Sequence, residues 1–232
     1  MDDPAVDDRP DRPRPLLSTA PELHQWTSVL VVLIATTIVT SVAPSRIGQA
    51  LIGLTLAALV VSVVQRRELV PLWLRVANVV ALAPAVALSF TDAASDSSTI
   101  TGAREVATAV VLVTAMVAIL LRVARHPVVT GATVMAVVDV YVLIGLAFAA
   151  TYGSVEAFTG DMFASGPASP FDTTYFSVIT LTTVGFGDLV PGSDLARSIA
   201  MVQALLGQVF LVVVVARVVA LMGQPNARRP QP

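Results

Sequence analysis

Long runs of apolar residues, separated by short polar breaks, dominate the chain from Trp26 onward. A helix needs roughly 20 residues to cross the hydrocarbon core of a bilayer, at about 1.5 Å per residue. No alternating pattern is long enough for a transmembrane barrel. The sequence therefore predicts an all-α membrane protein with six transmembrane helices, at residues 26–43, 47–64, 69–90, 104–122, 128–152 and 195–222.

The two ends of the chain have a different composition. Residues 1–25 are rich in aspartate, arginine and proline, and such a segment cannot bury enough apolar surface to offset its chain entropy. We expect a disordered cytoplasmic tail at 1–25 and a short cytoplasmic tail at 224–232.

Overall composition excludes several classes of function. Hydrophobic residues make up 55% of the chain and charged residues 13%, which is typical of a membrane protein. There is no cysteine and there are two histidines, so disulfide scaffolds, thiolate metal sites and cysteine catalysis are not expected. The sequence has no basic tract for nucleic acid and no arrangement of nucleophile and base. We therefore expect no enzyme activity, no cofactor and no nucleic-acid partner.

Arginine is concentrated in the loops on one side of the predicted bundle. By the positive-inside rule, that side is cytoplasmic. Both termini lie on it, so we expect a multi-pass protein of the cell membrane with cytoplasmic ends. The arginines on this side are Arg9, Arg12, Arg14, Arg66, Arg67, Arg75, Arg122, Arg125, Arg217, Arg228 and Arg229.

The loop between the fifth and sixth runs predicts a segment that enters the membrane and returns. Pro170 and Asp172 are typical of a helix N-terminus, and a helix over 171–182 would be about 18 Å long, or half a membrane. Its negative dipole end would point toward the bilayer centre, where a dehydrated cation needs stabilisation. In the next residues, 183–187, two glycines alternate with larger residues, which lets successive carbonyls turn to the same side. Such backbone oxygens can replace the hydration shell of an ion.

Thr183 to Asp188 reads TVGFGD, and here the sequence resembles the potassium channel family. The resemblance extends from residue 128 to the end, and implies a pore domain at 126–223 with an outer helix, a pore helix, a selectivity filter and an inner helix. It implies K⁺ sites at Thr183, Val184, Gly185 and Phe186, with Gly187 completing the filter and with Thr182 and Asp188 supporting it. One loop supplies a quarter of a pore, so a homotetramer in membrane lipid is implied.

The same resemblance places a gate on the predicted inner helix. Gly207 stands where such channels often carry a hinge glycine, and positions 208, 211, 215 and 219 share one helical face. We expect a cavity and gate formed by Gly207, Gln208, Leu211, Val215 and Val219. For Gln208 an interhelical hydrogen bond is an equal alternative.

The first four helices, at 26–125, resemble a voltage-sensor domain without its charges. The fourth has no charged residue from Val106 to Leu121, whereas a sensor needs several arginines within the span. We therefore predict potassium-selective, passive conduction without strong voltage gating. Asp139, inside the fifth run, is either a functional acid or a residue that makes a buried hydrogen bond or lies at the membrane interface. A poorly selective monovalent cation channel and a potassium-transporter subunit stay open as alternatives.

Overall fold

The computed structural model describes residues 26–35, 37, 72–92, 97–125 and 131–222. The predicted run at 47–64, the tails at 1–25 and 224–232, and residues 36 and 38–43 of the run at 26–43 lie outside these residues. The described elements are a short apolar helix at Trp26–Ala35 and five further helices. These are α3 (Leu72–Asp92), α4 (Ser98–Arg125), α5 (Gly131–Thr159), α6 (Pro170–Leu181) and α7 (Asp194–Met222).

Three of the described helices are long and apolar enough to cross a membrane: Ser98–Ala124, Gly131–Thr159 and Asp194–Arg217. They coincide with the fourth, fifth and sixth predicted runs, and α3 coincides with the third and contains Pro84. The described part of the chain thus has the helical architecture of a membrane protein. The total of six transmembrane helices stays a prediction.

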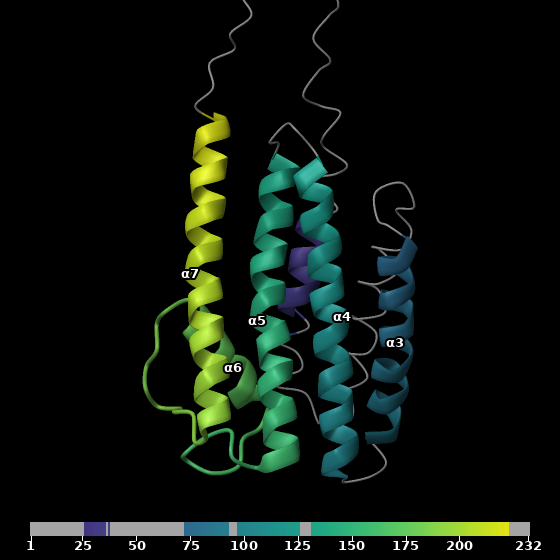
Figure 1. The fold of residues 1–232 in the computed structure, drawn as a ribbon, viewed down its shortest axis with the longest axis vertical. Coiled ribbons are helices and arrows are strands. Elements are labelled where there is room, and N and C mark those ends of the chain that lie inside the picture. Colours follow the sequence, from purple (N-terminus) through teal and green to yellow (C-terminus); the bar gives the residue numbers. More distant parts are fainter. Residues whose placement is uncertain (1–25, 36, 38–71, 93–96, 126–130, 223–232) are drawn as a thin grey trace, which may run out of the picture.

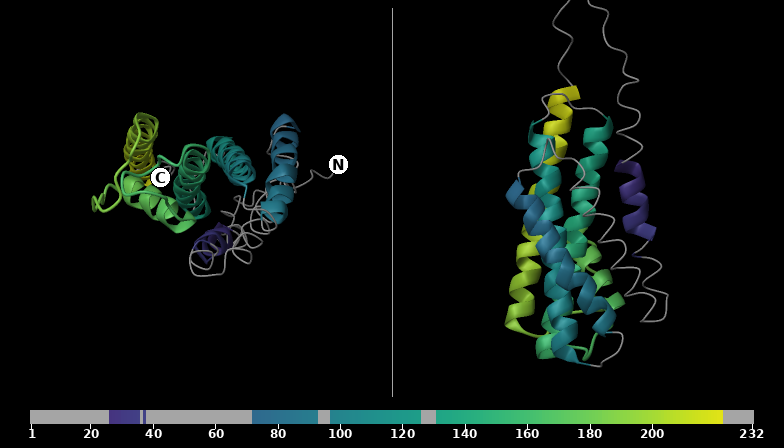
Figure 2. Two further views of the ribbon diagram at one scale, coloured as in Figure 1. Left: turned by 90° about the horizontal axis from the view of Figure 1, so that it is seen from below. Right: turned by 90° about the vertical axis from the view of Figure 1, so that its right-hand side faces the viewer.

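The long helices stand side by side, and α6 is a short helix beside α5 and α7 (Figure 1). Seen from below, α3, α4, α5 and α7 form a curved row, with α6 in the angle between α5 and α7 (Figure 2). Helix α5 therefore lies between the helices that precede it and the α6–α7 unit.

Two apolar clusters hold this arrangement together, and α5 contributes to both. The first fills the space between α4 and α5, where small side chains such as Ala115, Ala118 and Ala136 let the helices approach closely. The second surrounds Tyr152 at the other end of α5 and includes Phe163 and Phe176. Helix α6 is thus anchored to a spanning helix that is itself fixed by α4.

Candidate functional site

Helix α6 owes its position and length to signals in its own sequence. Ser169 is the N-cap residue and accepts a hydrogen bond from the Asp172 backbone N–H, while the Asp172 carboxylate accepts one from the Ser169 backbone N–H. Pro170 occupies the first turn, where its missing N–H costs nothing. The helix has 12 residues and ends at the C-cap residue Thr182. It agrees with the predicted helix at 171–182 to within one residue at each end.

The segment 183–187, which the sequence predicts to be the filter and which is called the filter segment below, has an alternating backbone. Thr183, Gly185 and Gly187 have φ values of +61°, +51° and +80°. Positive φ at every second residue turns successive carbonyls to the same side of the chain, which an ordinary strand cannot do. The backbone N–H groups of Val184 and Gly185 both donate to the Ile179 carbonyl, at 2.9 and 3.2 Å. The filter segment is therefore tied directly to the end of α6.

Aromatic side chains connect α6 to the far end of the filter segment. The Tyr175 hydroxyl donates to the Asp188 carboxylate at 2.9 Å, and this hydrogen bond raises the pKa of Tyr175 above its usual value. The Tyr175 ring also stacks on Phe186, with centroids 6.5 Å apart and planes 3° from parallel. Asp188 lies just beyond the filter segment, so this pair fixes that end of it against α6.

A fully buried network of polar side chains joins α5, α6 and α7. The Tyr152 hydroxyl donates to Gln203 Oε1 at 2.6 Å, and Gln203 Nε2 donates to the Ser177 carbonyl at 3.0 Å and to Ser177 Oγ at 2.7 Å. The Ser177 hydroxyl donates to the Gly145 carbonyl at 2.6 Å. Tyr152, Gln203 and Ser177 are each 0% exposed. This network fixes the middle of α6 to both neighbouring helices.

The end of α6 is held in a second way, around Leu181. The Tyr141 hydroxyl on α5 donates to the Leu181 carbonyl at 3.0 Å. On α7, a Cβ added at Gly207 would lie 2.7 Å from Leu181 Cδ1 and 3.1 Å from the Leu181 carbonyl oxygen. Gly207 is therefore needed for close packing of α7 on α6. Helix α7 continues through Gly207, so its role as a hinge stays a prediction.

The connections on either side of α6 and the filter segment are also paired. The Glu156 carboxylate at the end of α5 accepts hydrogen bonds from the backbone N–H groups of Met162 and Ala168. Phe163 forms an isolated antiparallel bridge with Pro191, beyond the filter segment. The loop before α6 thus supports the segment that follows Asp188.

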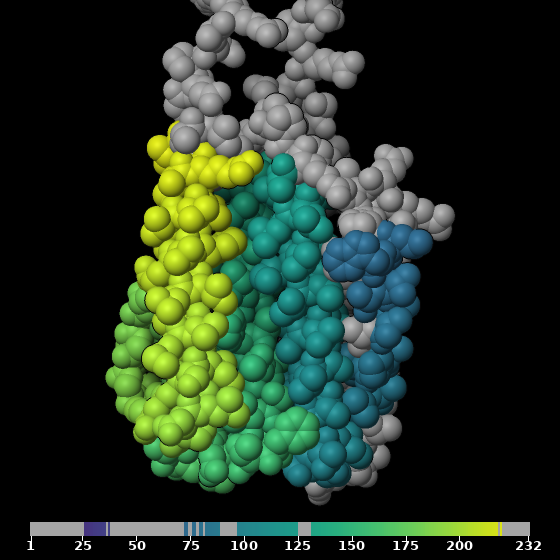
Figure 3. Space-filling view, viewed as in Figure 1, coloured from purple at the N-terminus to yellow at the C-terminus, as the bar shows by residue number. Residues whose placement is uncertain are grey.

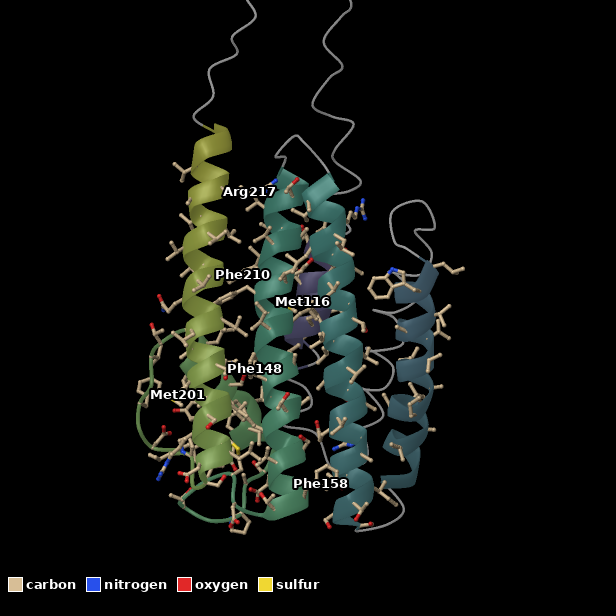
Figure 4. The ribbon with its side chains drawn as sticks, in the orientation of Figure 1. Met116, Phe148, Phe158, Met201, Phe210 and Arg217 are labelled. Carbon is tan, nitrogen blue, oxygen red and sulfur yellow. The ribbon has the colours of Figure 1, made fainter. Side chains whose placement is uncertain are left out.

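The surface that carries the filter segment is uncovered in the single chain. Residues 182–188 are all exposed, and Phe186 is 71% exposed. Helix α7 stands at one edge of the molecule with its outward face open (Figure 3). Met201 lies on the side of α7 away from α5, whereas Phe210 lies between the two helices and stacks on Tyr141 (Figure 4). The predicted gate residues Gln208, Leu211, Val215 and Val219 also belong to the exposed surface of α7.

Helix α4 has no charged residue between Val106 and Leu121, and its arginines lie outside this stretch. Two arginines of α4 are buried: Arg104 is 4% exposed and pairs with Glu105 at 2.7 Å, and Arg122 is 6% exposed and lies over the Trp26 ring. Among the described residues, no group of histidine, aspartate and glutamate side chains is arranged to hold a metal ion.

Together, a half-length helix, a backbone with alternating positive φ and two flanking spans form the arrangement that the sequence predicts for a pore loop, and they are called the pore-loop unit below. Residues 136–224 match the family described as "Ion channel". Over this segment the chain is similar to ion channels.

The curated relatives are plant potassium channels. The chain is 33% identical over 90 residues to two-pore potassium channel 4 of Arabidopsis thaliana, covering 38% of this chain and 30% of that protein. It is 40% identical over 47 residues to two pore potassium channel a of Oryza sativa subsp. japonica, covering 20% and 14% of the two chains. These matches confirm the resemblance to the potassium channel family. The chain spans less than a third of the length of these relatives, and no solved structure matches it.

Proposed function

We propose that the chain forms a potassium-selective channel that conducts K⁺ passively across the cell membrane. The observation that carries this proposal is the alternation of positive φ at Thr183, Gly185 and Gly187, directly after a helix of 12 residues. With this backbone, the carbonyls of residues 183–186 form a ladder of oxygen ligands, and the Thr183 hydroxyl adds one more. Gly187 completes the ladder, while Thr182 and Asp188 support its two ends.

The driving force for dehydrating the ion comes from backbone dipoles and oxygens. K⁺ leaves water at low cost only if ligands of fixed spacing replace its hydration shell. Helix α6 aims its C-terminus, the negative end of its dipole, at the start of the filter segment. No covalent step or cofactor is needed, because the ion moves down its own electrochemical gradient.

Four copies of the chain complete the pore. A single filter segment has nothing opposite its carbonyls, and its exposed residues join the open apolar face of α7, which includes Leu205 at 68% and Val209 at 60% exposure. A closed fourfold ring would cover this face and bring four filter segments together on the axis. In this assembly, Gln208, Leu211, Val215 and Val219 line the cavity and gate, and both termini face the cytoplasm.

A glycine substitution tests the proposal with a control of the same backbone type. Gly185→Ala forces an L-residue into a positive φ inside the filter segment, whereas Gly160→Ala does so at φ +69° in the loop after α5; a Cβ has open space at both positions. We expect K⁺ flux in proteoliposomes to be lost in Gly185→Ala and kept in Gly160→Ala. Equal flux in the two variants would contradict the proposal. Conduction of Na⁺ as well as K⁺ by the unmodified chain would instead favour the poorly selective alternative.

A further inference from the structure

Asp139 is an acidic residue inside the α5 span, and it is completely buried. Its exposure is 0%, and neither of its carboxylate oxygens has a hydrogen-bond partner. Its neighbours on the same face of α5, Ala136 and Leu143, belong to the apolar cluster between α4 and α5. An ionised carboxylate in such surroundings is strongly destabilised, so the packing seen here requires the neutral, protonated acid.

Among the side chains that the structure describes, no charged group on the surrounding helices is hydrogen-bonded to Asp139. On α4, Arg122 lies 5.1 Å from the centroid of the Trp26 ring, and Arg104 pairs with Glu105 toward the opposite end of the helix. Arg122 and Asp139 lie near the end of the helix pair where α4 ends and α5 begins. At the rise of an α-helix, Arg122 is roughly 7 Å closer to this end than Asp139 is. The Trp26–Ala35 helix has no charged residue. The other charged positions on packed helices are Arg125 at the end of α4, Arg75 and Asp92 near the ends of α3, Asp172 on α6, and Asp194, Arg197 and Arg217 on α7.

Asp139 is also close in sequence to the contact that holds the end of α6. Tyr141, two residues further along α5, donates to the Leu181 carbonyl, and its ring stacks on Phe210 of α7 at 6.0 Å. Positions two apart on a helix face roughly opposite directions. Asp139 therefore faces the α4 side of α5, while Tyr141 faces the filter segment and α7.

We propose that Asp139 is a proton-binding site that controls the pore, with the protonated acid supporting the conducting arrangement. Release of the proton to water at the Arg122 end of the helix pair leaves a charge in the apolar cluster. That charge is relieved only if water enters or if the guanidinium of Arg122 moves away from Trp26 toward it. Either change loosens α4 from α5 and shifts Tyr141, which weakens the support of Leu181. This proposal rests on the proposed function, because it assigns a control to the same pore.

The test is K⁺ flux in proteoliposomes between pH 5 and 9, with three forms of the chain. We expect flux of the unmodified chain to fall several-fold as pH rises. Asp139→Asn, which mimics the neutral acid, should stay at the low-pH level throughout. The control Asp161→Asn removes an exposed acid in the loop after α5 and should keep the profile of the unmodified chain. A flux that does not change with pH, or an Asp139→Asn variant with the unmodified profile, would overturn the proposal.

A second measurement separates failure of this proposal from failure of the proposed function. Infrared difference spectra of the unmodified protein report protonated carboxyl groups directly, whether or not the protein conducts. A protonated-carboxyl band that disappears at high pH, and is absent from Asp139→Asn at low pH, supports the proton site even if K⁺ flux is absent. If no band depends on Asp139, the proton site is wrong even if K⁺ flux is present. Asp139→Glu keeps a titratable group and should retain the band if the asparagine variant does not fold.

Discussion

Replacing Gln203 by leucine removes the centre of the network that joins α5, α6 and α7. The amide makes three hydrogen bonds, one from Tyr152 and two to Ser177. After the substitution, the Tyr152 hydroxyl and the Ser177 carbonyl remain buried without these partners. Each unsatisfied buried group costs about 1–3 kcal/mol, so we expect the free energy of unfolding to fall by about 2–6 kcal/mol. Because α6 carries the filter segment, K⁺ selectivity over Na⁺ should fall as well.

The assay pairs thermal or denaturant unfolding in detergent with K⁺ and Na⁺ flux measurements. Tyr152→Phe leaves only one oxygen, Gln203 Oε1, without its donor, and should cost about 1–3 kcal/mol. The double variant should be little worse than Gln203→Leu alone, since both changes break the same network. Ser198→Ala is the matched control, because its exposed hydroxyl bonds only within α7, to the Asp194 carbonyl. Stability and selectivity of Gln203→Leu equal to those of Ser198→Ala would refute the reasoning.

Three further outcomes follow from the same contacts. Gly207→Ala places a Cβ against Leu181, so it should lower the free energy of unfolding by about 1–3 kcal/mol and reduce conduction. Adding Leu181→Ala should restore part of the stability and part of the conduction. If the second change restores neither, Gly207 acts as a hinge instead. Tyr175→Phe removes the hydrogen bond to Asp188, and its K⁺ current should decline faster with time than that of the unmodified chain. Since that bond raises the pKa of Tyr175, the phenol stays neutral at pH 7 and at pH 9. The ratio of the two decline rates should therefore be the same at both pH values. Conductance should depend only weakly on voltage. Steep gating needs several charges that cross the membrane field, each contributing about 2.3 kcal/mol per 100 mV, and residues 106–121 of α4 contain no charge.

The pore-loop unit could be predicted from the sequence because its determinants are local. Proline and an acid mark the start of α6, and the alternating glycines permit the positive φ values of the filter segment. Apolar length alone gives α4, α5 and α7. These features depend on neighbouring residues, so one sequence is enough to read them.

The contacts that hold α6 in place could not be predicted, since they join residues far apart in the chain. Gln203 reads as a polar residue in an apolar run, and nothing in the sequence pairs it with Tyr152 or Ser177. Gly207 was expected to act as a hinge, and its packing against Leu181 depends on the register of α7 against α6. For Asp139, a buried hydrogen bond was one of the expected alternatives, and the structure gives its carboxylate none.

The reversal potential of the reconstituted protein, with K⁺ on one side of a bilayer and Na⁺ on the other, tests the central claim most directly. Ladders of carbonyl oxygens from four filter segments should pass K⁺ and reject Na⁺. We therefore predict a reversal potential far from zero that follows the K⁺ gradient, and its loss together with the current in Gly185→Ala. A reversal potential near zero, from equal permeability to the two ions, would contradict the account.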